Sequence, residues 1–380
     1  MSRRSVALLI ETSSGYCRGL LDGVISFMKE QGDWSVHLEQ NLFNTPPAWL
    51  NSWGGDGIIA RIDTDQFGQQ LKTYGVPVVD LSAARHVKGI PWADTDDRAI
   101  AQLAVEHFVE RGFRHLGYCG DAGFEWSRRR GRHFLQLATE VGCTIHEHQS
   151  NPRTDKSFNP AVDIQSLVTW IKDLPRPVAI MACYDFKAHQ LLDACHQLKL
   201  AVPEEVAILG VDDDRLLCEL AEPTLSSIIP DTRQTGYAAA ELLNRMMSGE
   251  SVNTETPLMT QPLGIRIRES TDTLAVEDDN IVKALRYIRQ HATENIRVAD
   301  ILPHINLSRR SLEHRFQKLV GHTPHEEIQR VRMNRIRDLL TETELSIHEI
   351  AARTGFDYGE YMAAAFKRET GMTPTEFRDR

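Results

Sequence analysis

The sequence predicts two doubly wound α/β lobes with parallel sheets, followed by an all-α domain that contains two helix-turn-helix units. Three observations lead to this expectation. Short apolar runs alternate with helical periodicity over the first 270 residues, a pattern recurs after 50 residues near the C-terminus, and the two parts of the chain differ in net charge. Since a domain takes roughly 100 to 200 residues, the chain of 380 residues has room for about two or three domains.

In the first part, apolar runs of strand length are each followed by a stretch with helical spacing. The expected strand and helix pairs are Val6–Ile10 with Tyr16–Glu30, Gly57–Ile62 with Asp65–Tyr74, Val76–Val79 with Arg98–Arg111, His115–Cys119 with Trp126–Val141, Val178–Ala182 with Phe186–Leu198, and Val206–Val211 with Asp231–Met247. Such alternation is typical of βαβ units, and nearly continuous apolar runs suit strands covered on both faces. Because one open sheet needs fewer strands, we expect two lobes with a ligand cleft between them, at the carboxyl ends of the strands.

Polar and aromatic side chains follow three of these strands, in Glu11–Arg18, Cys183–Asp185 and Asp212–Asp214. Carboxylates and guanidinium groups form paired hydrogen bonds to vicinal hydroxyls, and an aromatic face covers the C–H face of a sugar. The strand ends therefore predict a polyhydroxy ligand. The alternative is that the Ser and Asp residues simply cap the helices that follow.

Enzymatic signatures are missing from the sequence. It has no GxGxxG after the first strand, and no GxxxxGK[ST], HExxH or GxSxG. Asp212–Asp214 could hold Mg²⁺ or supply an acid/base pair, but a contiguous triplet cannot aim all three side chains at one site. We expect no catalysis, no cofactor and no metal. A sugar-metabolising enzyme with a helical appendage and a plain carbohydrate-binding receptor remain alternatives.

Composition places the chain among ordinary globular proteins, with 41% hydrophobic and 25% charged residues. The first apolar run, Val6–Ile10, is too short for the core of a signal peptide or a membrane span, so we expect a cytoplasmic protein with no membrane partner. The six cysteines show neither metal-ligand nor disulfide-framework spacing, which predicts reduced, buried thiols.

Charge is distributed unevenly along the chain. From Asp278 onward there are 17 Lys and Arg against 16 Asp and Glu, a net of +1, whereas the first 277 residues carry a net of −11. Such an asymmetry suggests that the C-terminal part meets a polyanion.

A repeat marks the C-terminal part, where residues 316–326 align with residues 366–376 at an offset of 50. In each copy a helix ends at a Gly, and Thr, Pro and Glu then start a new helix as its N-cap, first residue and third residue. The repeat therefore predicts two similar helical units in tandem.

Each unit also has a short helix before the one that ends in this Gly. Ser346 starts a helix to Arg353, and Tyr358–Thr370 follows a turn at Gly355; in the first unit, Val298–Leu302 precedes a helix capped by Ser308. Two helices joined by a short turn predict a DNA-binding helix-turn-helix, against the alternative of a plain helical bundle with a solvated basic face. The expected DNA-binding residues are Arg309, Arg310, Glu313, His314 and Lys318 in the first unit and Gly359, Glu360, Ala363, Ala364, Lys367 and Arg368 in the second, with Arg330, Arg332, Arg335 and Arg337 of the connecting helix as phosphate contacts.

The two parts of the chain resemble two known families. Residues 279–380 resemble the AraC/XylS-type DNA-binding domain in the segments Leu345–Ala351, Gly355–Phe356, Phe366–Arg368, Gly371 and Thr373–Arg378. The first 270 residues resemble the periplasmic-binding-protein-like sugar-binding domain of LacI/GalR-type regulators, with Asp96 before residues 101–107, Arg130 before Phe134, and Gly210–Asp213.

The resemblance implies a sugar-responsive transcription activator of pentose-catabolic genes. Residues 1–270 would sense the sugar, 271–279 would form a linker, and 280–380 would bind DNA. The implied partners are operator DNA, a pentose such as D-xylose or a related monosaccharide, a second copy in a homodimer, and RNA polymerase. The expected ligand-binding residues are Ser13, Arg18, Trp92, Asp96, Trp126, Arg130, Tyr184 and Asp212, with Arg130 and Asp212 gripping the sugar and Trp126 or Trp92 stacking on it.

Two departures from the DNA-binding family refine these expectations. The base-reading positions of the second unit fall at Gly359, Glu360, Ala363 and Ala364, which offer few hydrogen-bonding groups, so Arg310, Glu313 and His314 should read most bases. Pro303 should end its helix early. A connecting helix over Pro324–Leu340 should hold both units on one DNA face about one turn apart, unless each chain reads one half-site and uses the other unit for protein contacts.

Overall fold

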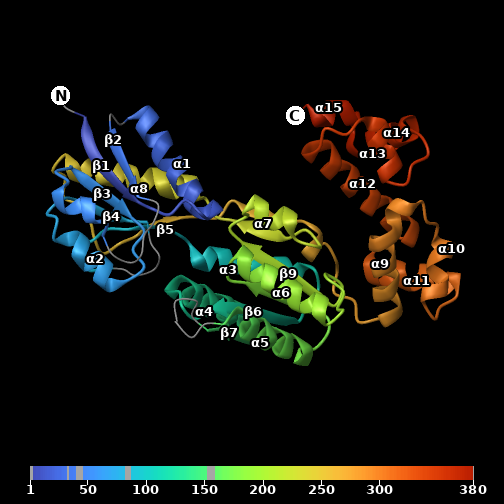
Figure 1. The fold of residues 1–380 in the computed structure, drawn as a ribbon. Coiled ribbons are helices and arrows are strands. Elements are labelled where there is room, and N and C mark those ends of the chain that lie inside the picture. The colour runs from blue at the N-terminus through green and yellow to red at the C-terminus, as the bar shows by residue number, and fades with distance from the viewer. Residues whose placement is uncertain (1–2, 32–33, 40–45, 82–86, 152–158, 380) are drawn as a thin grey trace. The chain divides into compact units, whose positions relative to one another are not determined.

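The structure, a computed structural model, describes residues 3–31, 34–39, 46–81, 87–151 and 159–379 (Figure 1). It divides into two compact units, Met1–Thr273 and Leu274–Arg380, called here the α/β unit and the helical unit. The expected linker begins at residue 271, but the α/β unit extends to Thr273, because Ser270 and Thr271 are fully buried in it. Among the described helices, none has the length and apolar composition of a membrane span.

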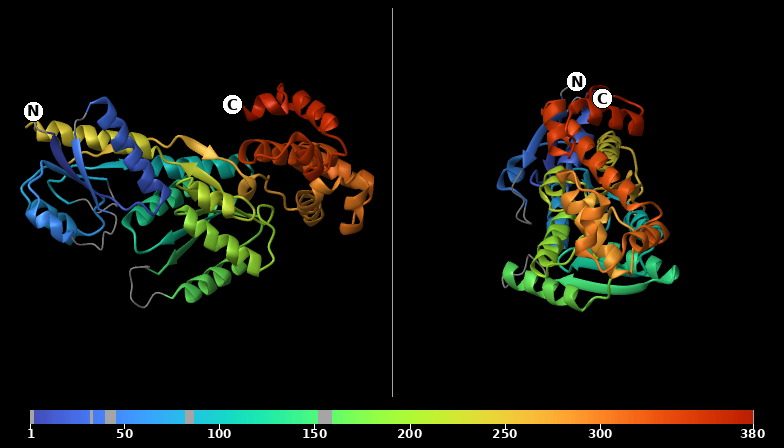
Figure 2. Two further views of the ribbon diagram at one scale, coloured as in Figure 1. Left: turned by 45° about the horizontal axis from the view of Figure 1, so that its top comes forward. Right: turned by 90° about the vertical axis from the view of Figure 1, so that its right-hand side faces the viewer.

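The first lobe of the α/β unit is a parallel sheet in the order β2-β1-β3-β4, made of Trp34–Glu39, Arg4–Leu9, Gly57–Ala60 and Val78–Asp80. Helices α1 (Gly15–Glu30) and α8 (Thr232–Met247) lie side by side over one face, and α2 (Asp65–Lys72) covers the other (Figures 1 and 2). Val6 and Leu8 of β1 pack towards α1 and α8, whereas Ala7 and Leu9 pack towards α2. This burial on both faces explains the continuous apolar run.

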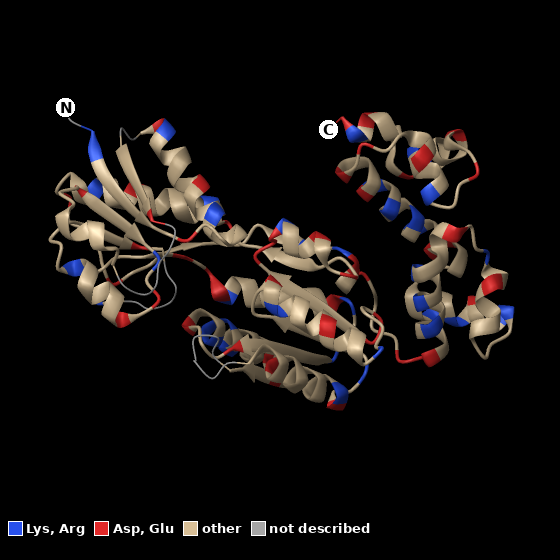
Figure 3. Ribbon diagram, in the orientation of Figure 1, with Lys and Arg blue, Asp and Glu red and all other residues tan. Residues whose placement is uncertain are grey.

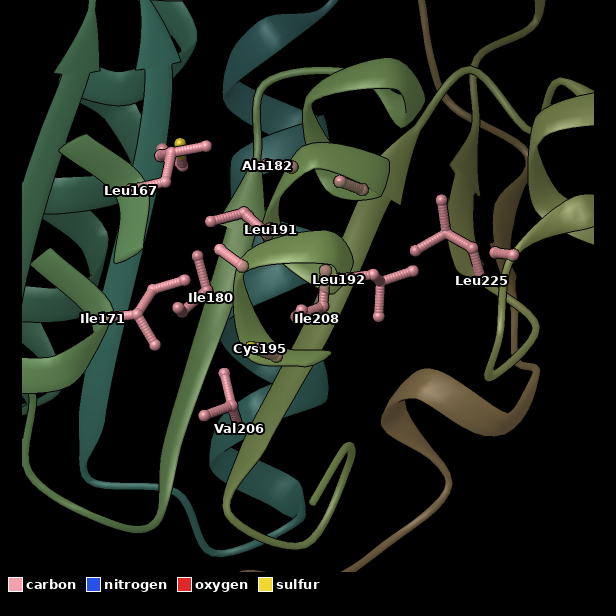
Figure 4. Packing of buried hydrophobic residues seen from close by; sticks show 14 of the residues in the cluster. Leu167, Ile171, Ile180, Ala182, Leu191, Leu192, Cys195, Val206, Ile208 and Leu225 are labelled. Atoms are coloured by element: carbon pink, nitrogen blue, oxygen red, sulfur yellow. The ribbon is translucent and has the colours of Figure 1, made fainter. Parts of the chain in front are cut away.

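The second lobe is a sheet in the order β12-β10-β9-β8-β6-β7, parallel except for β12. Its strands are Gly264–Arg266, Ser226–Ile229, Val206–Val211, Val178–Ala182, His115–Asp121 and Thr144–Ser150. Helices α5 (Pro160–Asp173) and α6 (Asp185–Gln197) cover one face, and Figure 4 shows Leu167 and Ile171 of α5 and Leu191 of α6 packed against Ile180 and Ile208 of the strands. The other face is covered by α3 (Asp97–Glu110) and α4 (Glu125–Glu140).

Strands β5 (Ala93–Thr95) and β11 (Leu258–Thr260) pair in parallel and carry the chain between the lobes. The expected doubly wound lobes are confirmed, but β2, β5, β7, β10, β11, β12, α5 and the short α7 (Arg215–Leu220) were not predicted from the sequence. Strand β7 shows the reason, since most of its residues are exposed or half-buried and only Ser150 is buried. An edge strand with so little buried surface carries no long apolar run.

The helical unit consists of α9 (Asp279–His291), α10 (Val298–Ile301), α11 (Arg309–Val320), α12 (Pro324–Glu342), α13 (Ile347–Arg353), α14 (Gly359–Thr370) and α15 (Pro374–Arg378), with 3₁₀ turns at Ala292–Glu294 and Leu302–His304. The repeat is confirmed at its helix ends. Gly321 and Gly371 adopt left-handed φ angles of 89° and 77°, and Thr323 and Thr373 each form a capping box with the Glu three residues on. Pro303 lies in the 3₁₀ turn directly after α10, so that helix ends early as predicted.

Helix α12 is shared by the two helix-turn-helix units. Ile328 lies in the core formed with α9, α10 and α11, whereas Met333 and Ile336 lie in the core formed with α13 and α14. Arg332 is 5% exposed and donates from Nε to the carbonyl oxygen of Ala292 at 2.6 Å. The expectation that Arg332 serves as a phosphate contact is therefore wrong: its guanidinium is buried against the backbone of Ala292 and lies 5.9 Å from the ring centre of Phe356 in the second helix-turn-helix unit.

Gly355 forms a second contact between the helix-turn-helix units. Its φ of 77° is left-handed, and a Cβ atom there would lie 2.9 Å from the carbonyl oxygen of Thr293 and 3.0 Å from the amide nitrogen of Asn295. Both the backbone conformation and the close approach require glycine at this turn.

We predict that Gly355→Ala destabilises the helical unit more than Gly371→Ala does. Both glycines have the same φ of 77°, but nothing lies within 4 Å of a Cβ at Gly371. The shared left-handed conformation costs each variant about 1 kcal/mol, and overpacking adds roughly 1 to 3 kcal/mol at Gly355 only. Native-state hydrogen exchange of amides in α12 to α14 measures the difference, and equal losses in the two variants would contradict the contact.

Candidate functional site

A cavity of about 290 Å³ opens among the strand ends of the α/β unit. This volume lies near the lower end of the range for small-molecule sites, roughly 300 to 1,000 Å³. The lining comes from both lobes: Glu11, Ser14, Tyr16, Cys17, Arg61, Asp63 and Phe67 from the first, Asp94, Thr95 and Asp97 around β5, and Phe124, Trp126, Arg130, Tyr184 and Asp212 from the second. Acidic, basic and aromatic groups thus converge on one cavity.

The carboxylate of Asp97 organises one wall of this cavity. Its Oδ1 accepts from Nε of Arg130 at 2.9 Å, and its Oδ2 accepts from Nε of Arg129 at 2.7 Å. Arg129 also pairs with Asp94, and Arg130 donates to the carbonyl oxygen of Cys183. Burial alone would lower the pKa of Arg130, but the adjacent Asp97 carboxylate, together with Tyr118, Asp212 and Cys183, raises it overall. Arg130 therefore stays positively charged although it is only 4% exposed.

Arg61 and Tyr16 line the cavity from the first lobe. The guanidinium carbon of Arg61 lies 5.0 Å from the centre of the Tyr16 ring, within the range of a cation–π contact. Burial and the nearby Asp94 carboxylate raise the pKa of the Tyr16 hydroxyl, which therefore stays protonated as a hydrogen-bond donor.

Aromatic rings line the part of the cavity that the second lobe contributes. Phe124 stacks on Trp126 with ring centres 5.1 Å apart, and Tyr184 meets the Trp126 ring edge to face at 5.6 Å. The guanidinium of Arg130 lies 5.3 Å from the centre of the same ring. These contacts fix Trp126 in the cavity lining before any ligand binds.

Asp212 is held in a strained conformation at the end of β9. Its φ is 114°, a left-handed value that is rare for a residue with a Cβ atom. Burial raises the pKa of its carboxyl to about 7, although Arg130 and Arg61 both act to lower the value. Asp212 therefore offers the cavity a carboxyl group that exchanges its proton near neutral pH.

The three consecutive aspartates point in different directions. Asp213 forms ion pairs with Arg266 at 2.8 Å and Arg268 at 3.0 Å, and Asp214 caps α7 while accepting from the amide nitrogen of Gly15 at 2.8 Å. Within the described ranges, no group of three or more His, Cys, Asp or Glu is arranged to hold a metal ion. All six cysteines are buried free thiols, as predicted.

Four of the eight expected ligand-binding residues line the cavity, namely Trp126, Arg130, Tyr184 and Asp212. The structure differs from the expectation at the other four. Asp96 caps α3 by accepting from the amide nitrogens of Arg98 and Ala99 at 2.9 and 3.1 Å, as in the alternative that its carboxylate serves the helix.

The remaining three side chains also lie outside the lining. Arg18 donates to the carbonyl oxygens of Thr12 and Ser13 at 3.0 and 2.9 Å, and its side chain is 46% exposed. Ser14, next to Ser13, lines the cavity and caps α1 instead. Trp92 forms a parallel backbone β-bridge with Asp80 beside the first sheet, and its side chain is not part of the cavity lining.

Several lining residues escaped the sequence analysis, and the strand-end rule would have found most of them. Arg61 and Asp63 directly follow β3, and Asp94 and Asp97 lie in or directly after β5. Arg61 lies within the apolar run Gly57–Ile62, and β5 has only three residues and so carries no apolar run of strand length. No sequence pattern predicts that Phe124 lines the cavity, because it is placed there by its stacking on Trp126.

The expected DNA-binding residues lie on α11 and α14. On α11, Arg309, Arg310, His314 and Lys318 are exposed, and Arg309 pairs with Glu313 at 2.9 Å. On α14, Glu360, Ala364, Lys367 and Arg368 are exposed, whereas Gly359 and Ala363 are half-buried. Figure 3 shows that Lys and Arg in the helical unit are interspersed with Asp and Glu. This mixture of acidic and basic residues explains why the net charge of the helical unit is small.

Three family models match the chain. An XylR N-terminal domain model matches residues 5–97, a periplasmic binding protein-like domain model matches residues 105–271, and a helix-turn-helix domain model matches residues 303–380. These matches agree with the expected fold class in both units.

Whole-chain relatives agree with the domain matches. The chain is 31% identical to a xylose operon regulatory protein of Haemophilus influenzae, over 98% of this chain and 97% of that protein. It is 30% identical to the protein of the same name in Escherichia coli K12, over 99% and 97%. A solved structure described as the xylose-binding transcription activator XylR matches with a TM-score of 0.85 and 30% identity, over 100% of this chain and 98% of that one.

The raised pKa of Asp212 predicts a pH-dependent stability of the ligand-free protein. The pKa of this carboxyl is about 7 in the folded chain, above its value of about 4 in the unfolded chain. The free energy of unfolding therefore falls as the pH rises from about 4 to about 7, because the folded protein must then hold a buried negative charge. Asp212→Asn removes this cost, so it should raise the melting temperature most at about pH 8, and the gain should shrink towards about pH 5.

Asp213→Asn is the matched control for this prediction. It changes the neighbouring carboxylate, which is paired with Arg268, and should lower the melting temperature because it removes that ion pair. Thermal melts at the two pH values provide the measurement. A gain for Asp212→Asn that is the same at both would contradict the assignment.

Proposed function

The chain belongs to the family of xylose operon regulatory proteins, and on this premise we propose that it is a sugar-responsive DNA-binding transcription regulator whose effector is D-xylose or a closely related pentose. The observation that carries this proposal is the joining, in one chain, of a sugar-sized polar cavity to a double helix-turn-helix. Its relatives are transcription regulators, and none of these comparisons supports the enzyme alternative.

The chemistry of the lining favours a neutral polyol over an anion. Its acidic members are Glu11, Asp63, Asp94, Asp97 and Asp212, and its basic members are Arg61 and Arg130. Arg130 is already paired with Asp97, so little unbalanced positive charge remains for a phosphate or a carboxylate. Hydroxyl groups can both donate to these carboxylates and accept from the guanidinium groups. The volume of about 290 Å³ suits a monosaccharide.

The four predicted residues that line the cavity, and Asp96, each have a proposed role. Arg130 and Asp212 hold hydroxyls of the sugar from one side, and the Trp126 ring covers its C–H face. Tyr184 supports the Trp126 ring through its edge-to-face contact. Asp96 acts through α3, because its cap fixes the start of the helix that carries Asp97.

For the helical unit, we propose that α11 reads bases in the major groove and that α14 lies in an adjacent groove segment of the same operator. Arg310 and His314 are exposed on α11, four residues apart, and so share one face. Helix α12 packs in the cores of both helix-turn-helix units, which favours a fixed spacing between α11 and α14 over a free linker.

The proposal includes the assembly and its place of action. Sugar binding shifts a homodimer on operator DNA towards a state that activates pentose-catabolic genes, through contact with RNA polymerase, and the size of this shift is bounded by the differential affinity of the sugar for the two states. The protein acts in the cytoplasm, where its DNA partner is found.

Calorimetric titration with D-xylose, L-arabinose and D-glucose tests the sensor. Arg130→Ala and Asp212→Asn should each weaken pentose affinity about ten- to a hundred-fold, since each removes a charged hydrogen-bond partner worth about 1.5 to 3 kcal/mol. Trp92→Phe alters an aromatic side chain outside the cavity and should stay within about two-fold of wild type. Wild-type affinity in both cavity variants contradicts the site, and turnover of any sugar in the panel would favour an enzyme.

Selection from an operator library tests the reading helix. Arg310→Ala should relax the preference at one base pair by about 1 to 3 kcal/mol, as expected for lost contacts to guanine O6 and N7. Lys318→Ala is the control, since loss of a phosphate contact should weaken binding to all sequences and reduce the salt slope by about one. An unchanged sequence preference for Arg310→Ala would rule out this role.

A further inference from the structure

Helix α14 departs from the capping pattern of most helices in the helical unit; the short α10 is the other exception, since its N-cap Arg297 also makes no side-chain capping bond. Five other helices begin after a residue whose side chain accepts a backbone N–H of the first turn, namely Asp278, Ser308, Thr323, Ser346 and Thr373. At α14 the N-cap is Tyr358, whose side chain makes no such bond. A Ser at this position would cap and stabilise the helix, so helix stability does not explain why a tyrosine is found there.

The repeat provides an internal comparison for this position. With the offset of 50, Tyr358 corresponds to Ser308 and Tyr361 corresponds to Ser311. In the first unit the two serines form a cap, with Oγ of Ser308 donating to Oγ of Ser311 at 3.1 Å. In the second unit an aromatic pair replaces this cap, with ring centres 5.7 Å apart in an edge-to-face arrangement.

Packing does not explain the pair either. The core face of α14 is formed by Met362 and Phe366, which are fully buried. Tyr358 is 60% exposed and Tyr361 is 68% exposed, and Phe186 is the only other large aromatic in the described part of the chain that counts as exposed. Two adjacent exposed aromatic rings at the start of one helix are a feature of binding surfaces.

The remainder of the helix indicates what the pair binds. Lys367 and Arg368 are exposed on the same helix and can contact phosphates, so the surface is suited to a polyanion. The positions expected to read bases are Gly359, Glu360, Ala363 and Ala364; apart from the Glu360 carboxylate they offer apolar contact and few hydrogen bonds. Among bases, thymine is recognised by apolar contact, through its C5-methyl group in the major groove.

We propose that Tyr358 and Tyr361 form a DNA-contact surface through which the second helix-turn-helix recognises thymine. The rings pack against thymine methyl groups at the edge of the major groove, and the hydroxyls donate to phosphate oxygens. This inference rests on the proposed function as a DNA-binding regulator, and it gives the second unit a sequence preference although its base-reading positions offer few hydrogen-bonding groups.

The test compares the double variant Tyr358→Ser/Tyr361→Ser with wild type on its operator. Since the two serines restore the pair found in the first unit, the variant should fold, and the single change Tyr358→Ser should raise the melting temperature by a few degrees. Operator affinity of the double variant should nevertheless fall about ten-fold or more. Tyr358→Phe/Tyr361→Phe keeps both rings, so it should retain the thymine preference and lose only phosphate affinity.

An operator in which deoxyuridine replaces thymidine removes the methyl groups alone. The affinity that wild type loses on this DNA should match the difference between the double serine and double phenylalanine variants on normal DNA, and the replacement should cost the serine variant less than it costs wild type. The proposal is overturned if the double serine variant binds both DNAs as tightly as wild type does. Unchanged DNA binding with lost activation would assign the tyrosines to a protein partner and also overturns it.

The outcomes separate this proposal from the function on which it rests. If wild type binds its operator and Arg310→Ala changes the preference while the tyrosine variants behave as wild type, only the thymine surface is wrong. If wild type binds no operator at any sugar concentration, the proposed function fails and the thymine surface fails with it.

Discussion

The geometry of the cavity depends on the carboxylate of Asp97. It binds Arg129 and Arg130 of α4 from the first turn of α3, and Arg130 extends the link to the backbone of Cys183 after β8. Removing one partner of a buried ion pair costs about 3 to 5 kcal/mol, because the other charge stays buried without compensation. The pair also fixes the guanidinium beneath the Trp126 ring. One carboxylate thus positions both the polar and the aromatic contacts proposed for the sugar.

Strand β9 joins the cavity to the end of the α/β unit. Asp212 faces the cavity, and the adjacent Asp213 pairs with Arg268, which precedes a 3₁₀ turn over Glu269–Thr271. Ser270 donates to the carbonyl oxygen of Ile208 in β9 at 2.6 Å, and the hydroxyl of Thr271 donates to that of Ser226 at 2.8 Å. The strand end that presents Asp212 is therefore bonded to the segment that leads into the helical unit.

In the helical unit, local rules and shared packing have separate roles. Capping boxes and left-handed glycines define where helices begin and end, and these signals act within a few residues. The fixed spacing of the two helix-turn-helix units instead depends on α12, whose two ends lie in different cores, and on Arg332 and Gly355, which contact the 3₁₀ turn over Ala292–Glu294 and the residue that follows it. Arg332 shows the difference, because its residue type predicts a phosphate contact and its burial makes it structural.

The sequence by itself determined the features that arise from local periodicity: the alternating strands and helices, the repeat at Thr323 and Thr373, and the strand-end groups Tyr184 and Asp212, while the family resemblance implied Trp126 and Arg130. These follow because apolar spacing, capping and strand ends are written over a few consecutive residues. Only the tertiary structure decided that Asp96 caps α3 while Asp97 holds Arg130, since both are acidic neighbours and their roles differ by which way each points from the helix start. It also decided that Arg61 joins Tyr16 in the lining, because that contact unites residues from separate strand ends, and adjacency across a fold has no local signal in the chain.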